Sequence, residues 1–260
     1  MKKILIGSPI HQKPIILKEF LNSLSQLESR NLDFHFLFID DNEDPNSSSE
    51  LETFKNKHKN VIIEKNTEVK VYNPDSHVWQ DSVILKVGKN KDKILKFACD
   101  NHFDFVFLVD SDIVLHPKTL IHLTSLEKEI VSEVFYTAWK EGTMEMPQVW
   151  LYDTYEFTSD KSLSEQEKSE KFFEFFNMIK EKGVYRVGGL GACTLISSLA
   201  LNKGVSFERI YNLSFWGEDR HFCIRAAALG IDLFASTFYP PLHLYRESDL
   251  IKVPNFWQEI

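Results

Sequence analysis

The sequence has few cysteines, no excess of basic residues and no long apolar run. Only three cysteines occur in 260 residues, and none lies in a CxxC pair, so no zinc site or disulfide framework is indicated. We expect Cys99, Cys193 and Cys223 to be reduced, buried thiols in a cytoplasmic protein. The formal net charge of −8 argues against a broad basic surface, so nucleic acid is not an expected partner.

Apolar runs are too short to cross a membrane. None approaches the roughly 20 residues that a transmembrane helix needs, so no transmembrane segment is expected. The N-terminal MKKILIGSPIHQKP has a shorter apolar stretch than a signal peptide and no small-residue cleavage site. We interpret it as a first strand over Lys3–Ile6 that ends at Gly7-Ser8-Pro9.

The N-terminal half predicts strands that alternate with helices. Helical spacing of apolar residues follows Pro14 and recurs over Lys91–Asn101, whereas residues 66–90 are polar and look irregular. Further strands are expected over Asp33–Ile39, Val61–Ile63 and Phe103–Val109. This alternation favours βαβ units and a parallel sheet.

The C-terminal half predicts a mixed arrangement. A capping box, Ser164 to Glu167, opens a charged helical stretch, and Gly230 stops a second helix that begins at Gly217. Expected strands are Glu129–Trp139, Gln148–Tyr152, Ala192–Ile196 and Asp232–Ala235. No repeat or linker is evident, so we expect one domain.

The stretch FLVDSDIVLHP, residues 107–117, is the strongest local signal. An apolar strand runs directly into Asp110-Ser111-Asp112, which sets two carboxylates one residue apart at the end of a strand. Parallel sheets bind ligands at the carboxyl ends of their strands, and two close carboxylates repel each other unless a cation binds. Mg²⁺ commonly takes one or two carboxylates plus substrate phosphates, so the motif predicts a metal–diphosphate site. A solvated turn capped by Asp112 is the alternative.

Other segments add candidates, each with an ordinary structural explanation beside the functional one. The second strand ends in Asp40-Asp41-Asn42. Gly188–Gly191 permits close approach of a ligand to the backbone, or is a simple bend. Glu218-Asp219 opens a helix, where carboxylates also favour the helix dipole. His243 follows Pro240-Pro241, and a lone histidine is usually structural.

Taken in this order, the segments resemble the glycosyltransferases of the GT-A fold, in particular the large inverting family known as family 2. The resemblance runs from Lys3 to about Tyr245. Its anchors are KILIGSP, FLFIDDN, FLVDSDIV, VGGLGACTLIS, WGEDRHFCIRAAALG and HLY. It implies an α/β fold with a mostly parallel central sheet flanked by helices. A single domain, 1–260, would combine a nucleotide-binding half (1–115) with an acceptor and catalytic half (116–260).

The resemblance also implies ligands. The donor would be a UDP- or GDP-sugar, the acceptor a glycan or another hydroxyl compound, and the cofactor Mn²⁺ or Mg²⁺. Lys91 and Asp92 stand where relatives carry an Arg-Asn pair, a departure from the family pattern. The implied nucleotide-binding residues are Ser8, Pro9, Asp40, Asp41, Lys91, Asp92, Asp110 and Ser111, and the implied metal ligands are Asp110, Asp112 and His243.

Catalytic roles follow from the same resemblance. Asp219 would be the base that takes the acceptor proton, with Glu218 orienting the acceptor or replacing it. Gly189, Gly191 and Trp216 would contact the donor or acceptor sugar. Retaining members of the fold also carry acidic residues in this region, so either stereochemical outcome stays open.

Three other functions remain open from sequence. DSDIV resembles the nucleophile motif of haloacid dehalogenase phosphatases, although that motif normally ends the first strand of its fold. A nucleotidyltransferase would share the sheet but usually has more glycine and basic residues than GSPIHQKP. A non-catalytic nucleotide-sugar binding module on the same fold is the third alternative. The charged segment 140–185 is either a mobile lid or a solvated surface helix.

Overall fold

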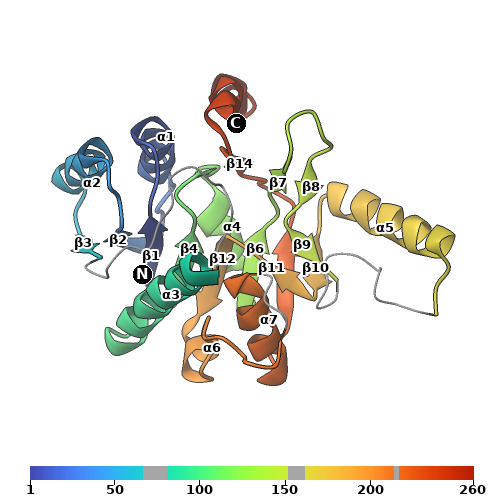
Figure 1. Cartoon of the computed structure of the whole chain (residues 1–260). Helices are drawn as coiled ribbons and strands as arrows, with labels where there is room; N and C mark the ends of the chain where they lie inside the picture. Colours follow the sequence, from blue (N-terminus) through green and yellow to red (C-terminus); the bar gives the residue numbers. More distant parts are fainter. Residues whose placement is uncertain (67–80, 152–161, 214–216) are drawn as a thin grey trace.

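The computed structural model of this chain describes residues 1–66, 81–151, 162–213 and 217–260. Its centre is an eight-stranded sheet with the strand order β10-β13-β6-β12-β4-β1-β2-β3. Six of these eight strands run in one direction, and only β10 and β12 run against them. The sheet is therefore mostly parallel, and helices cover both of its faces (Figure 1).

Among the described residues, the N-terminal half contributes four parallel strands and three helices. Continuous apolar runs form the strands, as expected for strands buried on both faces. The strands are β1 (Lys2–Ile10), β2 (Leu32–Asp40), β3 (Val61–Lys65) and β4 (Phe105–Val109), and the helices are α1 (Pro14–Ser25), α2 (Pro45–Lys57) and α3 (Asp81–Asp100).

The C-terminal half completes the sheet and adds short ribbons at its edge. Because β12 pairs antiparallel with both β4 and β6, it joins the two halves into one sheet. The sheet strands are β6 (Ile130–Glu133), β10 (Val184–Val187), β12 (Cys193–Ser197) and β13 (Leu233–Ser236). The ribbons pair β5 (Ile113–Val114) with β14 (Leu242–His243), β7 (Tyr136–Thr137) with β8 (Met146–Pro147), and β9 (Val149–Trp150) with β11 (Gly189–Leu190).

Helices of the second half surround this sheet. They are α4 (Thr119–Ser125), α5 (Glu165–Lys180), α6 (Ser198–Asn202), α7 (Glu218–Ala228), η2 (Glu247–Lys252) and α8 (Val253–Gln258). The capping box that opens α5 is present, with Ser164 and Glu167 bonded reciprocally. In Figure 1 this helix extends away from the body of the molecule. Among the described residues, none of the helices has both the length and the apolar character required to span a bilayer.

Two hydrophobic cores lie on opposite faces of the sheet. One packs α1, α2 and α4 against residues such as Ile4 and Ile6. The other packs α3, α6 and α7 against residues such as Leu5 and Leu108. This alternation follows from the two-residue period of a strand, and it fixes α3 and α7 on the same face of the sheet.

Several sequence expectations need correction. β1 does not end at Gly7 but continues to Ile10, because β2 pairs with it along that whole length while β4 pairs only as far as Gly7. Pro9 has no N–H to donate to a neighbouring strand. Beyond Gly7, no strand pairs with β1 on the side of β4, so the missing donor removes little from the hydrogen bonding of the sheet there. The expected strand 129–139 is broken into β6 and β7.

The start of α3 is also earlier than expected. The helix begins at Asp81 rather than Lys91, within residues that we expected to be irregular. Gly88 is a helix-weakening residue, but a Cβ there would lie 3.3 Å from Cβ of Glu218. The glycine therefore permits close packing of α3 on α7. Cys99, in the last turn of α3, is exposed rather than buried, unlike Cys193 and Cys223.

Candidate active site

The Asp110-Ser111-Asp112 motif stands at the carboxyl end of β4, where the parallel strands end. Directly after the motif, β5 pairs with β14, and this pairing sets His243 opposite Ile113. The backbone N–H of Leu244 donates to the carbonyl of Asp112 at 2.8 Å. A short ribbon thus carries a C-terminal histidine to the motif.

Asp112 and His243 are the two side chains of the site that are best suited to bind a metal ion. Nε2 of His243 lies 3.5 Å from Oδ2 of Asp112, and Nδ1 lies 2.8 Å from the Thr137 hydroxyl. Burial alone would lower the pKa of His243, but the carboxylate of Asp112 raises it above its ordinary value. The other oxygen of Asp112, Oδ1, is buried without a hydrogen-bond partner among the described residues. An unpaired buried carboxylate oxygen beside an imidazole fits an O,N-ligated divalent ion.

A complete metal site is not preformed. Within the described ranges, no three His, Cys, Asp or Glu side chains are gathered as a full set of metal ligands. Mg²⁺ and similar ions often take only one or two carboxylates, with substrate phosphates and water supplying the rest. The donors at Asp112 and His243 therefore fit an ion that binds together with a diphosphate.

Lys91 occupies the centre of a second, acidic cluster. Its side chain is only 2% exposed, and its Nζ lies 2.7 Å from Oε1 of Glu218, 3.2 Å from Oδ1 of Asp219 and 3.6 Å from Oδ1 of Asp110. These carboxylates come from two other parts of the chain, the end of β4 and the first turn of α7. The structure therefore brings the predicted base, its acidic neighbour and the first aspartate of the motif around one ammonium group.

Electrostatic conditions in this cluster disfavour full ionisation. Desolvation raises the pKa of Asp110 to about 6, although the positive charge of Lys91 stabilises the carboxylate and acts to lower this pKa. Desolvation also raises the pKa of Asp219 above its ordinary value, again against the attraction of Lys91. Perturbed pKa values of this kind are common at functional sites. A base with a raised pKa is suited to accept a proton near neutral pH.

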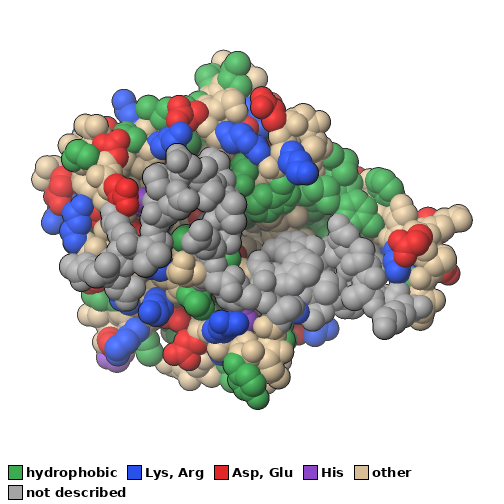
Figure 2. All heavy atoms as spheres, viewed as in Figure 1, with side chains coloured by type: hydrophobic (Ala, Val, Ile, Leu, Met, Phe, Trp, Pro, Cys, Tyr) green, Lys and Arg blue, Asp and Glu red, His purple; other side chains and the backbone are tan. Residues whose placement is uncertain are grey.

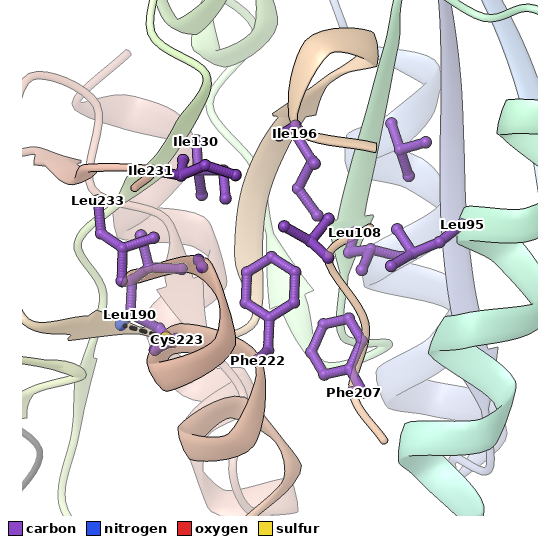
Figure 3. Packing of buried hydrophobic residues seen from close by; sticks show 14 of the residues in the cluster. Leu95, Leu108, Ile130, Leu190, Ile196, Phe207, Phe222, Cys223, Ile231 and Leu233 are labelled. Carbon is purple, nitrogen blue, oxygen red and sulfur yellow. Dashed lines mark hydrogen bonds between the residues drawn. The ribbon is translucent and has the colours of Figure 1, made fainter. Parts of the chain in front are cut away.

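Packing beneath the cluster holds Lys91 and α7 in place. The rings of Phe207 and Phe222 are stacked with centroids 4.5 Å apart, and Nζ of Lys91 lies 5.2 Å from the centroid of Phe207. Figure 3 shows both rings beside Leu108 in the core under the site. Because Phe222 lies one turn after Glu218, this stack anchors the first turn of α7.

Glycines set the shape of the site in three different ways. At Gly217, which precedes α7, φ is +141°, a conformation that favours glycine. A Cβ at Gly191 would lie 3.5 Å from Oδ2 of Asp219, so this residue borders the predicted base. A Cβ at Gly189 would collide with Trp150 at 1.9 Å. Gly189 thus serves packing against an aromatic ring, whereas Gly191 faces the acidic cluster.

The predicted nucleotide-binding aspartates of the second strand differ in their surroundings. Asp40 is buried and accepts hydrogen bonds from Asn42 and Ser48, and it also pairs with Lys65. Burial opposes ionisation, but these partners hold its pKa below the ordinary value. Asp41 instead pairs with Lys86 of α3 at 2.7 Å. Asp40 therefore shapes the loop after β2, and Asp41 lies between this loop and α3.

The remaining predicted residues lie at different distances from the chemistry. Ser8 is fully buried, Pro9 is half-buried, and Ser111 is buried within the motif. The carboxylate of Asp92 accepts the backbone N–H of Phe207 at 2.7 Å, so it anchors that segment and is not part of the acidic cluster. Trp216 lies outside the described residues.

Two polar side chains of the site, Lys86 and Thr137, are not predicted from the sequence. Lys86, which pairs with Asp41, lies in the segment that appeared irregular. Thr137, which bonds His243, is in a two-residue strand without any motif. Both pairings join distant parts of the chain, so no local spacing indicates them.

The surface above the site is partly apolar. Figure 2 shows hydrophobic side chains gathered between the C-terminal helices and α5, beside a hollow in this face. Figure 1 places β7 and β8 in that region, and the turn between them exposes Trp139 and Met144. Trp139 packs edge-on against Tyr245, two residues from His243. An aromatic surface therefore lies next to Asp112 and His243, the candidate metal ligands.

The sequence matches no protein-family model, and it matches none of the curated proteins. Solved structures do match. TarS of S. aureus, residues 1–349, matches 94% of this chain at 15% identity with a TM-score of 0.54, and its complex with UDP-GlcNAc matches 96% at 15% identity with a TM-score of 0.55. The mannosyltransferase PcManGT from Pyrobaculum calidifontis, in complex with GDP-Man and Mn²⁺, matches 94% at 11% identity with a TM-score of 0.58.

This chain covers only part of the length of those proteins. It spans 60% of the 349-residue form of TarS, 61% of its UDP-GlcNAc complex and 57% of PcManGT. The likeness covers almost all of this chain and rests on the arrangement of its elements, since few residues are identical. The chain therefore has the GT-A fold expected from its sequence.

Proposed function

We propose that this protein is a metal-dependent glycosyltransferase that moves a sugar from a UDP- or GDP-sugar to an acceptor hydroxyl. The observation that carries the proposal is the meeting of two clusters at one edge of the sheet. Asp112 and His243 form a pair with an unpaired buried oxygen, and Glu218 and Asp219 stand around Lys91 beside Asp110. In this fold the first cluster suits a diphosphate-bound cation, and the second suits a proton acceptor.

Asp112 and His243 would hold the metal, with Asp110 adjacent. When bound, a divalent cation neutralises the negative charge that develops on the departing diphosphate. The protein's own groups orient the site. Thr137 fixes the imidazole through Nδ1, so that Nε2 points toward Asp112. A hydrogen bond to the ring nitrogen that does not bind the metal commonly sets the ring orientation of a ligating histidine.

The nucleotide would lie across the ends of β1 and β2. Ser8 and Pro9 stand at the end of β1, and Asp41 and Lys86 face each other nearby. Asp41 is the better candidate of the two neighbouring aspartates for contact with the nucleotide, because the carboxylate of Asp40 is already satisfied by its own loop. Crevices at strand ends are the usual ligand sites of open α/β sheets.

Asp219 would take the proton of the acceptor hydroxyl. The hydroxyl oxygen attacks the anomeric carbon, the bond from that carbon to the diphosphate breaks with its electron pair on the diphosphate, and the proton passes to the Asp219 carboxylate. An attack of this kind inverts the anomeric centre. Gly191 borders Oδ2 of Asp219, where a Cβ would lie 3.5 Å from that oxygen, and Trp139 and Tyr245 offer an aromatic surface for an acceptor sugar.

Release of the nucleoside diphosphate tests this proposal. UDP-GlcNAc and GDP-mannose are rational first donors, because structural neighbours are recorded with them. With Mn²⁺ present, the wild-type protein is expected to release UDP or GDP by transfer to water. Asp219→Asn is expected to slow release by about 100-fold or more, the range of a general base. Donor binding without release in the wild type would instead indicate a non-catalytic binding module.

A further inference from the structure

Lys91 is enclosed in a way that fixes its ammonium group. It is 2% exposed, and its Nζ lies within 4 Å of three carboxylates, those of Glu218, Asp219 and Asp110. A buried ammonium persists only with such compensation, and removing one partner of a buried pair is strongly destabilising. The lysine and the acidic residues therefore hold one another in place.

The backbone of α3 brings Lys91 to this position by close contacts on both sides. Three residues earlier, Gly88 lets the helix approach Glu218, where a Cβ would lie 3.3 Å from the Cβ of that residue. Three residues later, Ile94 packs on Gly7 of β1, where a Cβ would lie only 2.3 Å away. Residues at i±3 share one face of a helix. This face of α3 is thus set against both β1 and α7.

Lys91 holds the two acidic residues of α7 unequally. Glu218 is 12% exposed and lies at 2.7 Å, whereas Asp219 is 28% exposed and lies at 3.2 Å. Lys91 contacts Asp219 through Oδ1, while Oδ2 borders Gly191. No other hydrogen bond to Asp219 arises from the described residues. Glu218 is therefore held at closer range, whereas Asp219 meets Lys91 through Oδ1 and sets its second oxygen, Oδ2, beside Gly191.

We propose that Lys91 is a positioning residue that holds Glu218 and turns Asp219 so that its Oδ2 faces the acceptor. This inference rests on the proposed function, in which Asp219 takes the acceptor proton. It differs from the nucleotide contact that the resemblance implies for Lys91. The two roles separate in kinetics, because a positioning residue acts on turnover and a nucleotide contact acts on donor affinity.

Lys91→Met and Lys91→Arg test this role, with Lys96→Met as the matched control. Lys96 lies on the same helix but is exposed, and it pairs with Asp100. For each variant, calorimetry gives the Kd of UDP and GDP with Mn²⁺, and release assays give kcat and KM with UDP-GlcNAc or GDP-mannose. Lys91→Met is expected to lower kcat by about 100-fold while KM and Kd stay within about threefold. Lys91→Arg is expected to recover part of kcat, and Lys96→Met to match the wild type.

Opposite results would overturn the inference. A large rise in the Kd of the nucleotide with kcat preserved would show that Lys91 contacts the diphosphate. An unchanged kcat would show that the acidic pair does not depend on it. If Lys91→Met does not fold, Lys91→Arg, which keeps the charge, decides by the same split between kcat and Kd. A wild-type protein that binds neither nucleotide would refute the proposed function and this role together, whereas normal turnover in the variants refutes only the role of Lys91.

Discussion

Glu133 is a buried acid whose ionisation should make the stability of this protein depend on pH. It ends β6 and is 1% exposed. Its Oε1 accepts a hydrogen bond from the Ser236 hydroxyl at 3.0 Å, its Oε2 accepts the backbone N–H of Tyr239 at 3.3 Å, and Nε2 of His122 lies 3.8 Å from Oε1. Burial raises the pKa of Glu133 from 4.5 to about 7 despite these bonds.

The sign and size of the effect follow from linkage. Because the folded pKa of Glu133 lies above the unfolded one, the folded state binds the proton more tightly. This contribution to stability is complete below about pH 4.5 and is lost as the pH rises through about 7. At about 1.4 kcal/mol for each pKa unit, the whole shift corresponds to roughly 3 kcal/mol, and most of it falls between about pH 5 and about pH 8.

Glu133→Gln removes this titration while it keeps the shape of the side chain. Urea unfolding at about pH 5 and about pH 8 would measure the free energy of unfolding of both proteins. Other acids with raised pKa, such as Asp110, are common to both proteins and cancel in the comparison. The wild type is expected to lose about 2–3 kcal/mol more than the variant over this range. Equal pH dependence in the two proteins would refute the reasoning.

Three further predictions concern packing, a thiol and a helix cap. Gly189→Ala sets a Cβ against Trp150 and is expected to lower the free energy of unfolding by about 1–3 kcal/mol or more; an unchanged urea midpoint would contradict this packing. Cys99 is expected to react quickly with Ellman's reagent in the folded protein, because the other two thiols are buried, and equal rates for all three would contradict the fold around α3. Ser164→Ala removes the capping box of α5 and is expected to weaken the helix by about 1 kcal/mol. Unchanged hydrogen-exchange protection in its first turns would show that this cap is not needed.

The sheet is the part of the fold that sequence predicts best. Buried parallel strands are continuous apolar runs, and the run that ends at Val109 identifies β4. Helix caps are equally local features. The capping box at Ser164 and the helix end at Gly230 can therefore be predicted from the neighbouring residues alone. The start of α3 is less predictable, because Gly88 looks like a loop residue until Glu218 packs against it.

The candidate site is predictable only in its local parts. Spacing alone marks Asp110 and Asp112 as a pair of carboxylates at a strand end. It does not distinguish Asp40, which is bonded within its own loop, from Asp41, which faces Lys86. The environment of Lys91 depends on carboxylates from β4 and α7, and no pattern near Lys91 in the chain indicates them.

The central claim is that the carboxylates of the motif exist to hold a cation against a nucleoside diphosphate. Calorimetry with UDP, GDP, CDP and TDP, with and without Mn²⁺, on the wild type and on Asp112→Asn tests it most directly. We expect Mn²⁺-dependent binding of UDP or GDP, and we expect the substitution to abolish it because it removes a charged oxygen donor. Failure of the wild type to bind any of the four nucleotides, with or without the metal, would contradict the account.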